Sequence, residues 1–283
     1  MSGALIVARY ALREAVRRRV ILVVLVLTVG FLALYGLGTA VSFDEVNDLE
    51  AADELDDRVL VGSTLFGLAM FTTLFLGTVL GVFLTLGAVR GDAERGLLQP
   101  IVVRPVGRTS LLLGRYVGAA LVCAVYVTVV YIAAMVITGV TGDWWPDDPV
   151  GPGAGLVLAV LVITALSLLG SVFMSSTANG IAVFMVFGAG LAAGLLGQIG
   201  DALAVQTLQD VATVSSWVLP FEALYQGGLH ALTADTGGVT GVIVQLGPFG
   251  GAQDAGPGLW LWALAYLGLV GAAARAGFAR RDL

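Results

Sequence analysis

Lysine is absent from this sequence, and histidine and cysteine occur once each, as His230 and Cys123. Without lysine the chain cannot contain the phosphate-binding loop GxxxxGK[ST], so it does not hydrolyse ATP by that route. One cysteine allows no disulfide within the chain, and we expect Cys123 to behave as a small apolar residue. A lone histidine is more typical of an interfacial polar residue than of a metal or acid/base site. We therefore expect no catalytic residue, metal ligand or cofactor site in this chain.

Charge is also scarce, because only 12% of the residues are charged whereas 58% are hydrophobic, and the mean hydropathy is +0.95. These values are typical of a multi-pass membrane protein and not of a soluble domain. We predict an all-α membrane protein with a single transmembrane domain over residues 1–283. Its six expected spans cover residues 20–41, 60–89, 110–140, 155–174, 181–197 and 258–274.

The middle of each apolar run contains no Asp, Glu, Lys, Arg or His. Proton-coupled transporters usually carry such groups inside the membrane as relays. Their absence argues against a proton-driven pump and favours an apolar or amphipathic cargo, if the chain transports one.

The arginines gather in short segments beside the apolar runs. Residues 4–19 place Arg9, Arg13 and Arg17 four apart on one helical face, opposite an apolar face. This pattern predicts an interfacial helix whose basic face meets anionic headgroups of the membrane lipid, although these arginines could also serve only to fix topology. A second arginine-rich segment, residues 90–109, joins the second and third spans and is expected to lie in the cytoplasm.

The charges are sorted by side of the membrane. Every arginine except Arg58 falls in a segment that alternation of the spans places inside. All acidic residues fall outside, with the exception of Glu14, Asp92, Glu94 and Asp282. Short loops rich in arginine stay in the cytoplasm. We therefore expect six spans in the plasma membrane, with the N and C termini both cytoplasmic.

Three connecting segments have distinct expected roles. Residues 42–58 carry eight carboxylates and read as a solvated outer loop; they lack the glycine that a calcium loop requires, and whether they gather cations stays open. Trp144 and Trp145 precede an acidic turn and fit an aromatic belt at the outer interface. Residues 175–180, SSTANG, are expected to end the fourth span and cap the fifth.

The segment 198–257 is acidic, contains no basic residue apart from the single histidine, and is expected to lie outside. Its apolar residues recur at helical spacing and Pro220 interrupts them, which predicts one or two short helices dipping into the outer leaflet. A helix broken at membrane depth must be covered by protein or line a cavity. We therefore predict an outer gate formed by Trp217, Pro220, Phe221 and Glu222.

Two pairs of glycines recur four residues apart, Gly77 with Gly81 and Gly190 with Gly194. Small residues at this spacing allow two helices to approach closely. The contact could lie between two subunits or within one.

The arginine-rich loop carries a series of motifs in a particular order. Two acids, Asp92 and Glu94, are followed by a Gly–Leu turn, by a Pro–x–x–Arg turn ending at Arg108, and by a closing Gly–Arg pair at Gly114 and Arg115. In this order the chain resembles the membrane subunit of an ATP-binding-cassette (ABC) transporter of the type-2 exporter class. It departs from that family at Leu97 and Gly107, where hydroxyl residues are common.

The resemblance implies that this loop docks into a cleft on a separate ATPase subunit, which holds ATP and magnesium, and that two permease chains line one path. The residues that would couple to the ATPase are Asp92, Glu94, Arg95, Gly96, Leu97, Arg104, Pro105 and Arg108. A homodimer and no contact with nucleic acid are expected. Two other hypotheses stay open: a membrane-embedded enzyme, and a membrane anchor or assembly factor that transports nothing.

Overall fold

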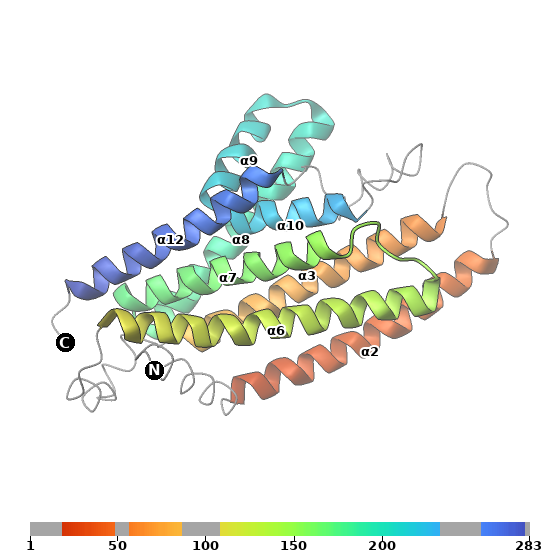
Figure 1. Ribbon diagram of the computed structural model, residues 1–283. Coiled ribbons are helices and arrows are strands. Elements are labelled where there is room, and N and C mark those ends of the chain that lie inside the picture. Colours follow the sequence, from red (N-terminus) through yellow and green to blue (C-terminus); the bar gives the residue numbers. More distant parts are fainter. Residues whose placement is uncertain (1–18, 49–56, 87–107, 233–255, 281–283) are drawn as a thin grey trace.

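The computed structural model of the protein describes residues 19–48, 57–86, 108–232 and 256–280. This part of the chain folds into helices, without any strand (Figure 1). The helices are α2 (Arg19–Asp48), α3 (Asp57–Thr85), α6 (Arg108–Gly142), α7 (Val150–Phe173), α8 (Ser176–Leu203), α9 (Gln206–Val218), α10 (Pro220–Ala231) and α12 (Pro257–Ala279).

Six of these helices are long and apolar enough to cross a bilayer: α2, α3, α6, α7, α8 and α12. The shortest of them, α12, has 23 residues and would measure about 34 Å at about 1.5 Å per residue, slightly more than a typical hydrocarbon core. The predicted class is therefore confirmed. The fold is an all-α bundle with six candidate spans, and two short helices precede the last of them.

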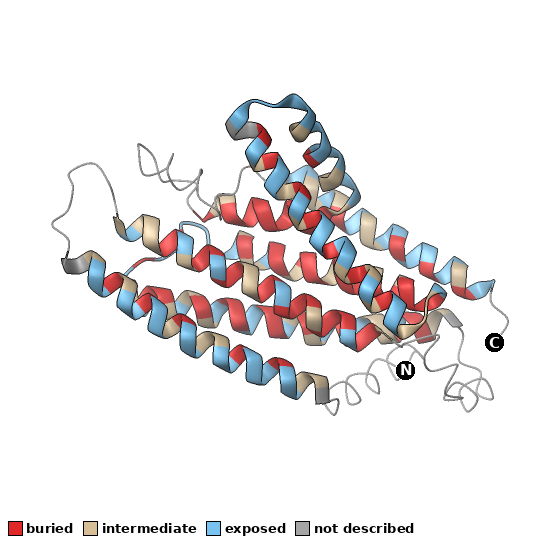
Figure 2. Cartoon of the chain, turned by 180° about the vertical axis from the view of Figure 1, so that it is seen from behind, coloured by how far each residue is buried: buried red, intermediate tan, exposed pale blue. Residues whose placement is uncertain are grey.

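Helix α7 occupies the centre of the bundle. It contacts α3, α6, α8, α10 and α12, whereas α2 lies at the edge against α3 and α6. Of the most apolar stretch of α7, 72% is buried, compared with 17% for α2 and for α12. Figure 2 shows the same contrast between buried central helices and exposed outer helices. The side chains of Leu156, Val160 and Ile163 on α7 are fully buried at this centre.

Successive spans alternate in direction, so the described ends of the chain meet at one end of the bundle. The start of α2, the start of α6 and the end of α12 lie together there, and α3 ends beside them (Figure 1). The α6–α7 connection lies at the opposite end. This arrangement is the one expected of six spans whose two ends share one side of a membrane.

Several predicted boundaries were wrong because helices continue beyond the apolar runs. The supposed acidic loop 42–58 is partly helical, since α2 extends to Asp48 and α3 begins at Asp57. A helix that leaves the bilayer can continue in water, where carboxylates are solvated. Likewise α8 begins at Ser176, so most of the SSTANG segment is its first turn, and Asn179 donates a buried hydrogen bond to the Ser167 carbonyl (2.9 Å).

The two adjacent tryptophans do not share an environment. Trp145 is half-exposed and fits the predicted belt, but Trp144 is buried against Phe66, with ring centroids 6.1 Å apart. The prediction for Trp144 was therefore wrong. Gly62 makes room for this ring, because a Cβ there would come within 2.5 Å of Trp144 Cδ2.

The pair Gly77 and Gly81 packs within the chain. A Cβ on Gly77 would meet Val127 of α6 at 2.9 Å and Val160 of α7 at 3.0 Å. A Cβ on Gly81 would overlap the Thr164 hydroxyl, and buried Cys123 lies 3.5 Å away. Of the two interpretations of this pair, the structure supports close packing within one subunit.

Some predictions concern residues outside the described ranges. They include the interfacial helix 4–19 with Arg9, Arg13 and Arg17, and residues 233–255 of the segment expected to lie outside.

Candidate functional site

The predicted coupling loop lies almost wholly outside the described residues. Of the residues predicted to contact the ATPase, only Arg108 is included, as the first residue of α6. Asp92, Glu94, Arg95, Gly96, Leu97, Arg104 and Pro105 are not described. The helices on either side fix where the loop starts and finishes, because α3 ends and α6 begins at the same end of the bundle (Figure 1).

The predicted outer gate lies at a break between two short helices. Helix α9 ends at Val218 and α10 begins at Pro220, with Leu219 between them at φ −126° and ψ 71°. Proline has no N–H and favours the first turn of a helix, so α10 begins at this residue. Val211, Val214 and Val218 before the break are exposed, whereas Phe221 and Tyr225 after it are buried. The apolar residues that the sequence suggested as one helical face therefore form two separate surfaces, an exposed one on α9 and a buried one on α10.

Trp217 connects α9 to the last span instead of facing the bundle interior. The side chain is 58% exposed, and its ring contacts that of Trp262 with centroids 5.6 Å apart. The indole N–H of Trp262 donates a hydrogen bond to the Trp217 carbonyl (2.9 Å). Of the four predicted gate residues, Trp217 is thus separated from the buried Pro220, Phe221 and Glu222.

Two glycines of α8 form the seat for α10. A Cβ on Gly190 would lie 2.5 Å from Cζ of Phe221, and a Cβ on Gly194 would overlap the Glu222 carboxyl. The Phe221 ring is fully buried and stacks on Phe187 of α8, with centroids 5.8 Å apart and an interplanar angle of 21°. The second small-xxx-small pair therefore joins α8 to α10 within one chain.

Glu222 is the chemically distinctive group of this region. It is only 5% exposed, and its Oε1 atom has no hydrogen-bond partner among the described residues. Burial raises the pKa of this carboxyl to about 7, and a hydrogen bond with the Gln226 side chain partly opposes that rise. Burial, and to a smaller extent the charge of Glu222, also raises the pKa of the neighbouring Tyr225 hydroxyl.

A short chain of amides continues from Glu222 toward α8. Gln198 Nε2 donates a hydrogen bond to Gln226 Oε1 at 3.0 Å. This arrangement combines the Glu222 carboxyl with two amides. The carboxyl can bind or release a proton near neutral pH. Within the described ranges, no group of three His, Cys, Asp or Glu residues could hold a metal ion.

The sequence indicated only part of this cluster. Glu222, Gly190 and Gly194 were recognised, whereas Gln198, Gln226 and Phe187 were not. Gln226 follows Glu222 by four residues, which places both on one helical face, and this spacing was the available signal. Nothing in the sequence linked Gln198 on α8 to Gln226 on α10.

A comparison with models of protein families identifies the family of the chain. The model of a family described as "ABC-2 family transporter protein" matches residues 5–249. The chain belongs to the ABC-2 transporter family. The match includes the predicted coupling loop, the first five candidate spans and the short helices α9 and α10, and it ends before α12. Among curated proteins, none gives a significant match to the sequence.

Family membership confirms the resemblance seen in the coupling loop. An ABC-2 protein of this kind is a multi-pass membrane protein and the permease component of a transporter, and membership implies association with an ABC ATPase. The absence of lysine from the sequence agrees with a division of labour in which another chain binds the nucleotide.

Proposed function

We propose that the protein is one half of a dimeric ABC-2 permease that moves an apolar or amphipathic cargo outward, driven by an ATPase docked on residues 90–108. The observation that carries this proposal is the family match across the coupling loop. The positions of α3 and α6 support it, because they hold both ends of the loop at one end of the bundle. ATP and magnesium would be bound by the ATPase.

The chemistry of the loop suits a protein partner. Asp92 and Glu94 would lie in the first turn of a loop helix, where the helix dipole stabilises carboxylates. Arg95, Arg104 and Arg108 would then pair with carboxylates of the ATPase, since guanidinium groups form strong, directional contacts with carboxylates.

A dimer is supported by the packed centre of one bundle. Leu156, Val160 and Ile163 of α7 are fully buried where a pore through one chain would run. A path for cargo is therefore expected between two copies. In the described spans, the buried polar groups are mainly hydroxyls that bond to carbonyls of the same helix, such as Thr73 to Ala69 (2.7 Å) and Thr164 to Val160 (2.7 Å). The outward faces of the spans carry exposed apolar side chains such as Leu22, Val29 and Leu261, so a path between two copies would suit an apolar or amphipathic cargo.

The alternatives receive less support. A membrane-embedded enzyme would need a reactive constellation, and the cluster around Glu222 has one titratable group and two amides. An anchor or assembly factor without transport would not require an ATPase.

Co-purification tests the proposal. The tagged chain is purified from cells that contain the candidate ATPase, and wild type is compared with Glu94→Ala and Arg108→Ala at matched expression. We expect at least about tenfold less ATPase with either variant, because removing one partner of a buried charge pair costs about 2–5 kcal/mol. Arg58→Ala is the matched control, since Arg58 lies in the first turn of α3, at the opposite end of the bundle.

Each result has a definite meaning. An intact complex with both loop variants would move the ATPase contact away from residues 90–108. Failure to recover an ATPase with wild type would contradict the transporter proposal and favour the anchor or enzyme hypotheses.

A further inference from the structure

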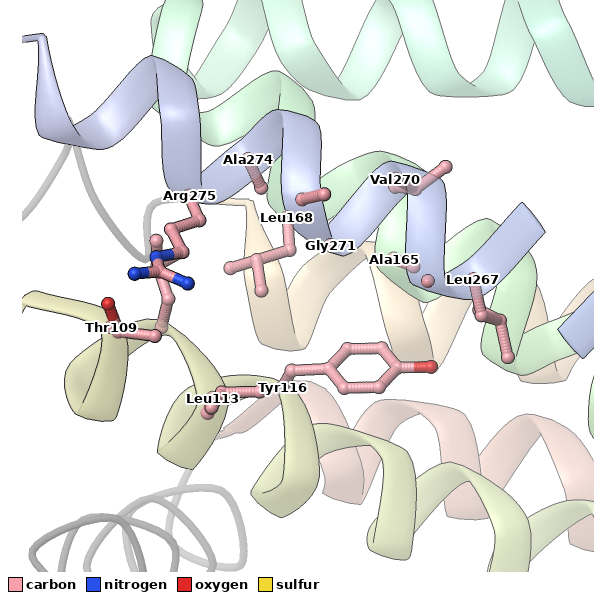
Figure 3. A pocket seen from close by; sticks show the side chains of 13 residues that line it. Thr109, Leu113, Tyr116, Ala165, Leu168, Leu267, Val270, Gly271, Ala274 and Arg275 are labelled. Carbon is pink, nitrogen blue, oxygen red and sulfur yellow. The ribbon is translucent and has the colours of Figure 1, made fainter. Parts of the chain in front are cut away.

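A crevice lies between α6, α7 and α12, near the end of the bundle where α6 begins and α12 ends (Figure 3). Its volume is about 350 Å³. This size lies within the range of roughly 300–1,000 Å³ typical of small-molecule pockets. Ala165 and Leu168 of α7 line it, and Leu113 and Val270 line it from α6 and α12. Leu113 is 52% exposed, so the crevice opens to the outer surface of the bundle.

Small residues of α12 leave this space open. A Cβ added to Gly268 or to Gly271 would meet no atom within 4 Å. Ala272 and Ala274 continue the same small surface. The crevice therefore exists because α12 carries only small residues along this surface, and one larger side chain there could fill it.

The crevice has one polar end. Figure 3 shows the Arg275 guanidinium pointing from α12 toward Thr109 at the start of α6. None of the described residues that line the crevice is acidic. The hydroxyl of Tyr116 already donates a hydrogen bond to the Leu161 carbonyl (3.3 Å). Arg275 therefore supplies a cationic group at the mouth of an otherwise apolar space.

We propose that this crevice binds an anionic phospholipid of the surrounding bilayer, with one acyl chain along α6, α7 and α12 and the phosphate against Arg275. Basic pockets between membrane helices hold anionic headgroups in this way. The apolar walls match a hydrocarbon chain, and the arginine lies near the end of its span, where a headgroup is found. The proposal requires that the chain lie in a membrane but does not rest on ATPase docking.

Lipid retention measured by native mass spectrometry tests the proposal. The detergent-purified chain is titrated with phosphatidylglycerol and with phosphatidylcholine that carries the same acyl chains. We expect wild type to retain one phosphatidylglycerol in preference to phosphatidylcholine. Arg275→Gln should weaken phosphatidylglycerol binding by about fivefold and remove the preference, the effect expected for one arginine near a headgroup. Arg280→Gln, which removes an exposed arginine directly after the same helix and outside the crevice, should change it by less than about twofold.

A second pair of variants tests the apolar part of the site. Gly271→Leu should fill the crevice and reduce retention of both lipids, whereas Gly258→Leu, at the other end of α12 and equally free of neighbours, should not. Equal phosphatidylglycerol retention by Arg275→Gln and Arg280→Gln would overturn the proposal. Loss of the dimer in Gly271→Leu with unchanged lipid retention would also overturn it, because a second copy of the chain would then occupy the crevice.

Discussion

At the scale of single residues, Glu222 stands apart from every other acid in the described part of the chain. It lies against Gly194 with one carboxyl oxygen lacking a hydrogen-bond partner there, and its pKa is raised to about 7 by burial. A buried carboxyl of this kind is neutral in mildly acidic solution and becomes charged as the pH rises. The folded protein therefore holds this proton more tightly than the unfolded chain does.

This linkage predicts a pH-dependent stability. The stabilisation from protonated Glu222 is fully present below about pH 4.5, the ordinary pKa of a glutamate, and is lost as the pH rises through the folded-state pKa of about 7. Relative to Glu222→Gln, wild type should lose on the order of 3 kcal/mol of stability between these limits. Thermal unfolding in detergent at pH 5 and pH 8 measures this difference. Asp210→Asn, which changes an exposed acid on α9, is the control, and equal pH profiles for wild type and Glu222→Gln would contradict the prediction.

At the scale of elements, the contact between α8 and α10 depends on the glycine pair of α8. Gly190 accommodates a ring that is already stacked on Phe187, so the ring has little room to move. Gly194 accommodates the end of a more flexible side chain. Gly190 is therefore the more demanding of the two positions.

Gly190→Ala should destabilise the protein by about 1–3 kcal/mol, because the added methyl group forces the Phe221 ring to shift in a packed site. Gly188→Ala is a matched control on the same helix, since a Cβ there meets no atom within 4 Å. The control should be neutral or stabilise the helix by up to about 1 kcal/mol. Melting temperatures of the two purified variants give the comparison. Equal melting temperatures would show that α10 does not press on α8 at this point.

At the scale of the whole molecule, the bundle has two distinct ends. The start of α2, the start of α6 and the end of α12 share one end, and the α6–α7 connection marks the other (Figure 1). The distribution of arginine predicts that the first end faces the cytoplasm.

Cysteine labelling tests this orientation. The wild-type chain provides a silent background, because its only cysteine, Cys123, is fully buried. A membrane-impermeant maleimide should label Val150→Cys, at the exposed start of α7, in intact cells. Arg280→Cys, at the end of α12, should react only after permeabilisation. The reverse pattern would show that the termini face outward.

The number of spans could be predicted from the sequence, because it depends on the length of each apolar run. The break at Pro220 could also be predicted, because a proline lacks the backbone N–H that a helix interior requires. The position of each span in the bundle was not. Helices α2 and α7 have nearly equal hydropathies, 2.8 and 2.7, yet 17% of one and 72% of the other is buried. In a bilayer, side chains facing lipid and side chains facing protein are both apolar, so periodicity does not separate them. Glu222 was placed outside because acids usually are, and only the tertiary contacts of α10 show that it is buried.

Two hydroxyl pairs join α2 to α6, and they have a consequence for the order of synthesis. Tyr126 lies 2.6 Å from the Thr28 hydroxyl and Tyr35 lies 2.6 Å from the Thr138 hydroxyl, across 98 and 103 residues of chain. At a translation rate of about 5–20 residues per second, α2 emerges from the ribosome about 5–20 seconds before these partners exist. Thr28 can spend that interval bonded to its own helix, at the Val24 carbonyl (2.7 Å). Tyr35 has no such partner within α2 among the described contacts, so its hydroxyl gains its protein partner only when the third span arrives.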